Sequence, residues 1–136
     1  MGNVQINRDI NFEDMQHVIK NNHEYLIINT LSVSEQNCLI FGTLPAEKEE
    51  ETINRLITTN KYLNIIIYGK NCNDLSVNKK YEQLNNLGFQ NIFIYKGGLF
   101  EWLMLQDIYG IDLFKTTCKQ RDLLKYKPDK ILSFNF

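Results

Sequence analysis

The chain has 136 residues, of which 43% are hydrophobic and 23% are charged, with 15 basic residues balanced against 16 acidic ones. This length fits one domain, and the apolar share is enough to bury a single core, so wholesale disorder is excluded. A net charge of -1 gives no electrostatic reason to expect nucleic acid or an acidic membrane as a partner.

The start of the chain and its cysteines indicate a cytoplasmic protein. Residues 1–6 are polar and lack the apolar core of a signal peptide, and no window approaches the about 18 apolar residues of a membrane span. The 3 cysteines cannot all pair within one chain, and they lack the spacing of metal ligands. We therefore expect a reducing compartment, no metal site and no cofactor.

The first half of the chain predicts two helices and a buried strand. Asn11 is a typical N-cap, and the acids that follow it complement the positive end of a helix. Residues 25–28 form a continuous apolar run, which is typical of a strand buried on both faces. Residues 38–41 form a shorter apolar run, and the proline and acids of residues 45–51 predict the start of a second helix.

The second half repeats this alternation. Residues 65–68 predict a strand, residues 69–74 a polar loop, and residues 76–87 a helix that Gly88 ends. A further strand at 92–95 precedes Gly97-Gly98, which opens another helix. Strands that alternate with helices over short loops predict an α/β fold with a central, mostly parallel sheet flanked by helices.

The C-terminal third carries apolar residues that need a cover. Residues 99–109 are apolar around much of the helix circumference, and such a helix is buried or covered. We expect the extension at about 106–136 to pack on a core of about 12–105, within a single domain of 1–136. The alternative is that a partner or a second copy covers this helix.

Several motifs of the second half occur together in one known family. They are Ile65-Ile66-Ile67-Tyr68, the loop after it, Leu84-Asn85-Asn86-Leu87-Gly88-Phe89, Ile92-Phe93-Ile94-Tyr95, and Gly97-Gly98 before Trp102. In this order and spacing they resemble the C-terminal half of a rhodanese-like domain. The first half is less similar, because Asn29 stands where relatives place Asp, and Cys38-Leu39-Ile40 stands where relatives carry Gly-His-Ile.

The resemblance implies a site in the loop after the strand. In this family a cysteine directly after the strand's Tyr carries sulfur as a persulfide, and backbone amides with a helix N-terminus stabilise its thiolate. Gly69 stands at that position here, and Cys72 follows three residues later. The candidate sulfur carrier is therefore Cys72, within an anion-binding loop formed by Gly69, Lys70, Asn71, Asn73, Asp74, Leu75 and Ser76.

Asp74 can be interpreted in two ways. A carboxylate near the loop amides would repel both a thiolate and an anionic sulfur donor. Alternatively, Asp74 or Asn73 caps the following helix, which is common for these residue types. Of the other cysteines, Cys38 is expected to be a buried small hydrophobe and Cys118 an ordinary thiol of the tail.

Two functional hypotheses follow from these residues. The first is a rhodanese-like module without normal sulfurtransferase activity, which binds a protein or a small sulfur-containing anion and has a binding or regulatory role. The second is a thiosulfate-type sulfurtransferase that uses Cys72. A rhodanese-fold phosphatase would place an arginine six residues after the cysteine, and that position is Asn78. The sequence does not predict the oligomeric state.

Overall fold

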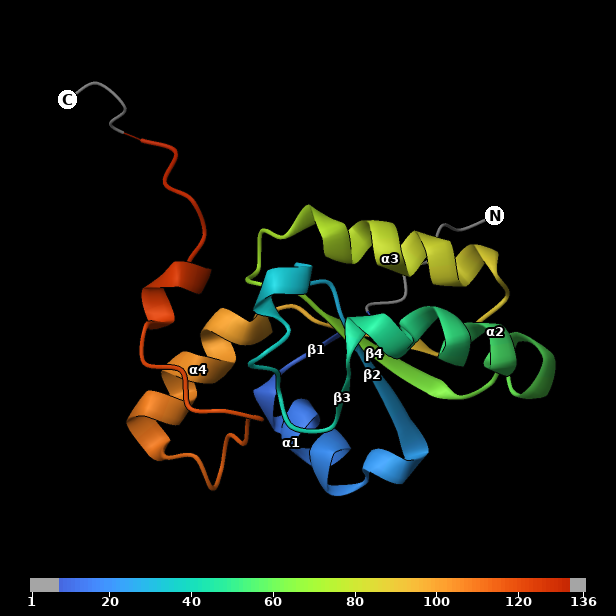
Figure 1. The fold of residues 1–136 in the computed structure, drawn as a ribbon, viewed down its shortest axis with the longest axis horizontal. Helices are drawn as coiled ribbons and strands as arrows, with labels where there is room; N and C mark the ends of the chain where they lie inside the picture. The colour runs from blue at the N-terminus through green and yellow to red at the C-terminus, as the bar shows by residue number, and fades with distance from the viewer. Residues whose placement is uncertain (1–7, 133–136) are drawn as a thin grey trace.

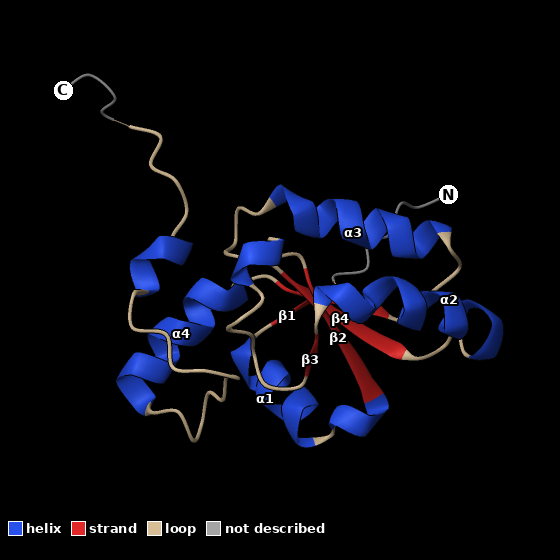
Figure 2. Ribbon diagram, in the orientation of Figure 1, coloured by secondary structure: helices blue, strands red, loops and turns tan. Residues whose placement is uncertain are grey.

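The computed structural model describes residues 8–132, which form one parallel β-sheet between two layers of helices. All paired strands run parallel, in the order β1-β5-β4-β2-β3. Figure 2 shows the strands in red between helices in blue. The strands are β1 (Asp9–Ile10), β2 (Tyr25–Asn29), β3 (Thr43–Leu44), β4 (Asn64–Tyr68) and β5 (Ile92–Tyr95). The predicted α/β fold with a mostly parallel sheet is confirmed.

The helices cover both faces of the sheet. They are α1 (Phe12–Lys20), α2 (Glu49–Thr59), α3 (Leu75–Asn86) and α4 (Gly98–Tyr109), with short 3-10 turns η1 (Asn22–Glu24), η2 (Val33–Glu35), η3 (Ala46–Lys48) and η4 (Leu123–Tyr126). Helices α2 and α3 lie on one face, and α1 and α4 lie on the other (Figure 1). No helix within residues 8–132 has the length and apolar character needed to cross a bilayer.

The helix ends form where the sequence predicts them. Asn11 caps α1 in a capping box, in which its side chain accepts from the Asp14 amide and the Asp14 carboxylate accepts from the Asn11 amide. Gly88 follows α3 with a φ of 100°, a left-handed conformation that glycine adopts without strain.

Two segments differ from what the apolar runs of the sequence indicate. β1 has only two residues, too few to show an alternating pattern in the sequence. Residues 38–41 do not form a strand of the sheet, because β3 begins only after the turn at Gly42. Residues 38–41 are instead held against the C-terminal segment, through an isolated antiparallel bridge between Ile40 and Thr116.

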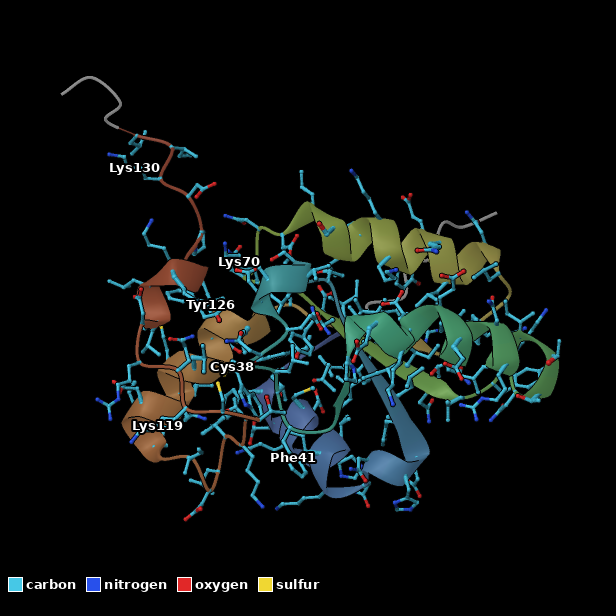
Figure 3. The ribbon with its side chains drawn as sticks, in the orientation of Figure 1. Cys38, Phe41, Lys70, Lys119, Tyr126 and Lys130 are labelled. Atoms are coloured by element: carbon cyan, nitrogen blue, oxygen red, sulfur yellow. The ribbon has the colours of Figure 1, made fainter. Side chains whose placement is uncertain are left out.

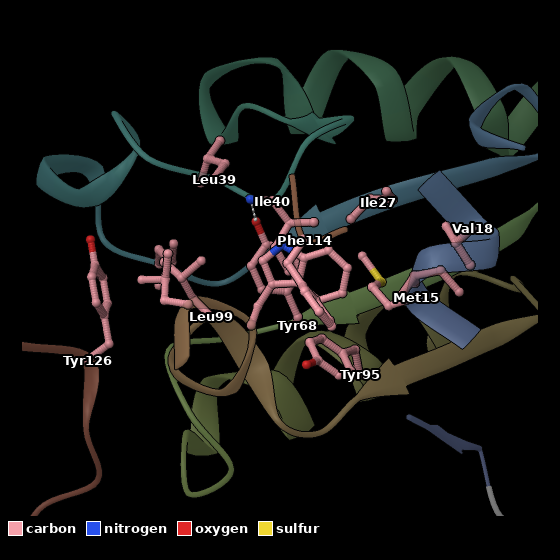
Figure 4. Packing of buried hydrophobic residues seen from close by; sticks show 14 residues of the cluster. Met15, Val18, Ile27, Leu39, Ile40, Tyr68, Tyr95, Leu99, Phe114 and Tyr126 are labelled. Carbon is pink, nitrogen blue, oxygen red and sulfur yellow. Dashed lines mark hydrogen bonds between the residues drawn. The ribbon is translucent and has the colours of Figure 1, made fainter. Parts of the chain in front are cut away.

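A cluster of aliphatic and aromatic side chains between the sheet, α1 and α4 forms the larger part of the core (Figure 4). Trp102 packs edge-to-face on Phe114, with ring centroids 5.0 Å apart, and on Tyr95, at 5.9 Å. The buried Tyr68 hydroxyl accepts a hydrogen bond from the Ile40 amide at 3.1 Å. This bond satisfies a polar group that would otherwise be costly to bury.

The C-terminal segment packs on α4. The Trp102 indole donates to the Lys115 carbonyl at 3.0 Å, and the Gln106 amide donates to the Phe114 carbonyl at 2.7 Å. Phe114 and Tyr126 are buried, at 3% and 0% exposure. The segment therefore covers the inner side of α4, whereas the outer residues Met104, Ile108 and Tyr109 remain exposed.

Candidate functional site

The loop of residues 69–74 begins at the carboxyl end of β4, beside the carboxyl end of β2. The strand that follows β2 in the chain, β3, lies toward one edge of the sheet, and the strand that follows β4, β5, lies toward the other edge. The direction of the strand order therefore reverses between β2 and β4. Open parallel sheets bind ligands at such a reversal. The Thr30 amide donates to the Tyr68 carbonyl at 3.0 Å and joins the two strand ends.

The Asp74 carboxylate binds the loop from within. Its Oδ2 accepts from the Lys70 amide at 3.0 Å and from the Thr30 hydroxyl at 3.1 Å. Its Oδ1 accepts from the Ser76 amide at 2.9 Å, as the N-cap of α3. Asp74 is therefore the cap that the sequence suggests, and it also occupies donors that an external anion would use.

Gly69 has no space for a side chain while Asp74 is in this position. A Cβ added at Gly69 would lie 2.4 Å from Asp74 Oδ2, 2.7 Å from Val77 Cγ2 and 2.8 Å from Thr30 Oγ1. These distances are far below van der Waals contact. The position of the Asp74 carboxylate therefore requires a glycine at residue 69.

The Gly97-Gly98 pair lets α4 approach the loop closely. The Leu99 amide donates to the Gly69 carbonyl at 2.9 Å, and the Phe100 amide donates to the Lys70 carbonyl at 3.0 Å. Gly98 has a φ of 69°, and a Cβ there would lie 2.8 Å from the Gly69 carbonyl oxygen. The first turn of α4 thus fixes the beginning of the loop.

Asn71 connects the loop to the C-terminal segment. Its side-chain amide donates to the Tyr126 carbonyl at 2.9 Å, and its Oδ1 accepts from the Asn73 amide at 2.9 Å. Asn71 is 9% exposed. The sequence carries no local signal for this bond, because its two partners are 55 positions apart.

Cys72 lies on the outside of the loop. Its side chain is exposed, and within residues 8–132 its only hydrogen bond goes to Asn73 Oδ1, with a sulfur–oxygen distance of 3.8 Å. It lines a pocket of about 500 Å³ together with Asn78 and Lys96. Leu75, which begins α3 beside it, is also exposed.

The Lys70 side chain pairs with an acid from outside the loop. Its Nζ lies 3.7 Å from Glu35 Oε2, and the two side chains are 40% and 20% exposed. Both line a second pocket of about 560 Å³, on the side of the loop where the C-terminal residues Lys127 and Asp129 lie. The charge of Lys70 is therefore already partly compensated.

Asn29, at the end of β2, supports the neighbouring segment. Asn29 and Gln36 exchange two side-chain hydrogen bonds, at 3.1 Å and 2.8 Å, and the Leu31 amide donates to Asn29 Oδ1 at 3.0 Å. Asn29 is 2% exposed and fully bonded. Its contacts account for the amide at this position in structural terms.

The remaining candidates are placed as follows. Cys38 is buried, as predicted, while Cys118 is partly exposed. Within residues 8–132, no three histidine, cysteine or acidic side chains gather in a way that could hold a metal ion.

Comparisons with known proteins agree with this fold. Residues 13–105 match the family model for the rhodanese-like domain. No curated protein sequence matches the chain. Among solved structures, the rhodanese-like domain of the Alr3790 protein from Anabaena is 18% identical, covers 96% of this chain and 92% of its own, and has a TM-score of 0.57.

Two further solved structures have a similar fold. A thiosulfate sulfurtransferase from Pseudomonas aeruginosa is 15% identical over 72% of this chain and 19% of its own, with a TM-score of 0.57. Ygr203w, a yeast protein tyrosine phosphatase of the rhodanese family, is 13% identical over 82% of this chain and 94% of its own, with a TM-score of 0.57. At these identities the likeness concerns the fold alone.

Proposed function

The chain belongs to the rhodanese-like domain family, and from this membership we propose that it is a member without sulfurtransferase activity, serving as a binding or regulatory module. The observation that carries the proposal is the Asp74 carboxylate, which accepts from the Lys70 and Ser76 amides. A persulfide carrier needs such donors for its own thiolate. Here they are bonded to a fixed negative charge.

The position after β4 supports the same proposal. Gly69 has no reactive atom, and the contacts of its missing Cβ leave no room for a cysteine unless Asp74 moves. A negative carboxylate at the loop also repels an anionic donor such as thiosulfate. The loop is thus occupied by its own acid, which favours a protein over a small sulfur-containing anion as the partner.

Phosphatase activity has little support in this loop. Gripping a phosphate with two parallel hydrogen bonds is the role of an arginine guanidinium. Neither of the two pockets beside the loop is lined by an arginine, and Asn78 lies where the family's phosphatases place one. The fold that the chain shares with the yeast phosphatase therefore does not favour phosphatase activity here.

A thiosulfate:cyanide assay tests the proposal. Wild type and Cys72→Ser are measured beside an active rhodanese as a positive control. We expect both proteins to give only the uncatalysed rate, because the Cys72 sulfur is not held by loop amides. Turnover by wild type that disappears in Cys72→Ser would overturn the proposal.

The second candidate function is sulfur transfer by Cys72. Its support is the exposure of the thiol and its place in a pocket with Lys96, where a donor anion could approach. The thiolate would attack the outer sulfur of thiosulfate and release sulfite, leaving a persulfide on Cys72 that cyanide then removes as thiocyanate. Peptide mass spectrometry after incubation with thiosulfate reveals this persulfide directly.

A further inference from the structure

The buried Cys38 lies in a segment that pairs with the C-terminal part of the chain. Residues 38–41 and 115–118 run antiparallel, with a bridge between Ile40 and Thr116. The Phe41 amide donates to the Lys115 carbonyl at 3.0 Å, and the Thr117 amide donates to the Leu39 carbonyl at 2.8 Å. Counting outward from the bridge therefore places Cys38 opposite Cys118.

The hydrogen bonds show which type of pair the two cysteines form. The backbone bonds join residue 39 to 117 and residue 41 to 115. The alternate pairs, 40 with 116 and 38 with 118, are therefore not hydrogen-bonded through the backbone. Such pairs have Cα atoms about 4.5 Å apart, and their side chains are closer than in hydrogen-bonded pairs. Disulfides span Cα separations of roughly 4.4–6.8 Å.

The side chains confirm that these two residues are neighbours. Cys38 Sγ donates to the Cys118 carbonyl oxygen, with a sulfur–oxygen distance of 3.4 Å. Both cysteines are free in this structure, Cys38 fully buried and Cys118 partly exposed (Figure 3 shows Cys38). One residue therefore has a solvent-accessible thiol, and the thiol of the other lies against the backbone of that residue.

We propose that Cys38 and Cys118 are a redox-modification site, where a small-molecule disulfide converts the two thiols to one intramolecular disulfide. The proposal rests on the opposed positions of two thiols on paired segments. It concerns a part of the molecule that the proposed function does not use.

The reaction balances with a glutathione-type disulfide as the oxidant. The Cys118 thiolate attacks one sulfur of oxidised glutathione, whose S–S bond breaks, and the released thiolate takes up a proton. The Cys38 thiol then loses its proton and attacks the Cys118 sulfur, forming the protein disulfide and releasing the second glutathione. Two protein thiols are oxidised, and one glutathione disulfide is reduced to two thiols.

The surroundings of Cys38 make the second step slow at neutral pH. Burial, together with the neighbouring Cys118 thiol, raises the pKa of Cys38 to about 12, while Lys125 acts in the opposite direction. The Tyr68 hydroxyl is a further titratable group close to this thiol. Since the thiolate is the attacking species, conversion of the mixed disulfide should become about tenfold faster for each unit by which the pH rises, up to that pKa.

The disulfide would fix the path of the C-terminal segment. Further along that segment, the Tyr126 carbonyl accepts from Asn71, so the same stretch of chain contacts both Cys38 and the loop. A covalent bond at Cys118 closes a long loop of the unfolded chain. We expect it to raise the melting temperature of the domain by about 5–15 °C.

The test uses the full chain in glutathione buffers of increasing oxidised fraction. Wild type, Cys72→Ser and Cys118→Ser are analysed by intact mass without reduction, by thiol titration after unfolding, and by melting. Cys118→Ser is chosen because this side chain is partly exposed, and Cys72→Ser is the matched control. Wild type should lose the mass of two hydrogens and retain one titratable thiol, and the peptide map should join Cys38 to Cys118.

The two serine variants show which cysteines form the disulfide. Cys72→Ser should form the same bond and retain no titratable thiol, whereas Cys118→Ser should form no disulfide within the protein chain at the same buffer ratio. The proposal is overturned if wild type keeps three titratable thiols at every ratio, or if it stops at a glutathione adduct on Cys118 even at alkaline pH. A disulfide that includes Cys72 would contradict it equally.

Discussion

The loop after β4 and the junction between residues 38–41 and 115–118 each place a cysteine in a setting that decides its chemistry. In the loop, Cys72 is exposed and the amides nearby bind Asp74. At the junction, Cys38 is buried but has a second cysteine beside it. In both proposals the groups beside the thiol, rather than its exposure alone, determine what the thiol can do.

The two regions are linked by the C-terminal segment, and the largest expected effect concerns that link. Tyr126 is 0% exposed in the core, so Tyr126→Ala should lower the free energy of unfolding by about 3–5 kcal/mol. Chemical denaturation measures this. Leu124→Ala, in the same segment at 64% exposure, should cost less than about 0.5 kcal/mol. Equal effects would show that the segment is not part of the core.

The close approach of α4 to the loop gives the next largest effect. Gly98→Ala introduces a Cβ 2.8 Å from the Gly69 carbonyl oxygen at a φ of 69°, so it should cost about 2–5 kcal/mol from clash and backbone strain. Gly42→Ala is the control, with a φ of 89° but only ordinary contact at 3.6 Å from Ile27. It should cost about 1–2 kcal/mol. Similar losses would argue against a tight fit between α4 and the loop.

The pairing of Gly69 with Asp74 is tested by a double-mutant cycle. Gly69→Ala alone should cost about 1–3 kcal/mol, because its Cβ meets Asp74, Val77 and Thr30. In an Asp74→Ala background the closest of these contacts is absent, and the cost should fall by about 1 kcal/mol. Urea unfolding of all four proteins measures the coupling. Additive costs would mean that glycine and carboxylate are independent.

The junction should show an effect that is absent at neutral pH and appears only in alkaline solution. The Cys38 pKa rises from 9.0 to about 12 on folding, so the unfolded chain loses this proton at lower pH than the native one. Stability relative to Cys38→Ala should be constant below about pH 9 and fall between about pH 9 and 12, by at most about 1.4 kcal/mol per pH unit. Comparing the two proteins removes the contribution of the tyrosines. A constant difference up to pH 12 would contradict the burial of this thiol.

The elements with strong local patterns were predictable from the sequence. The apolar runs of β2, β4 and β5 and the capped start of α1 each depend on residues close together in the chain. The capping role of Asp74 is of the same kind, since its Oδ1 bonds an amide two residues away.

The contacts that define the site were not predictable, because they join distant positions. Asp74 Oδ2 bonds Thr30, 44 positions earlier, and Cys38 contacts Cys118, 80 positions later. Gly97-Gly98 was recognisable as a motif, yet its reason is a backbone approach to Gly69 that only the folded chain contains. Neither periodicity nor propensity carries information of this range.

The most direct test of the central claim is a thiosulfate titration followed by the backbone amide signals of Lys70 and Ser76 in NMR spectra. The control variant is Asp129→Ala. It removes an exposed acid from the pocket that Lys70 and Ser76 also line, and its side chain bonds neither amide. We predict no saturable shift of these two signals in wild type or in Asp129→Ala, and a saturable shift in Asp74→Ala, where the amides are released. A saturable shift of both signals in wild type would show that Asp74 does not occupy the loop, and would contradict the account.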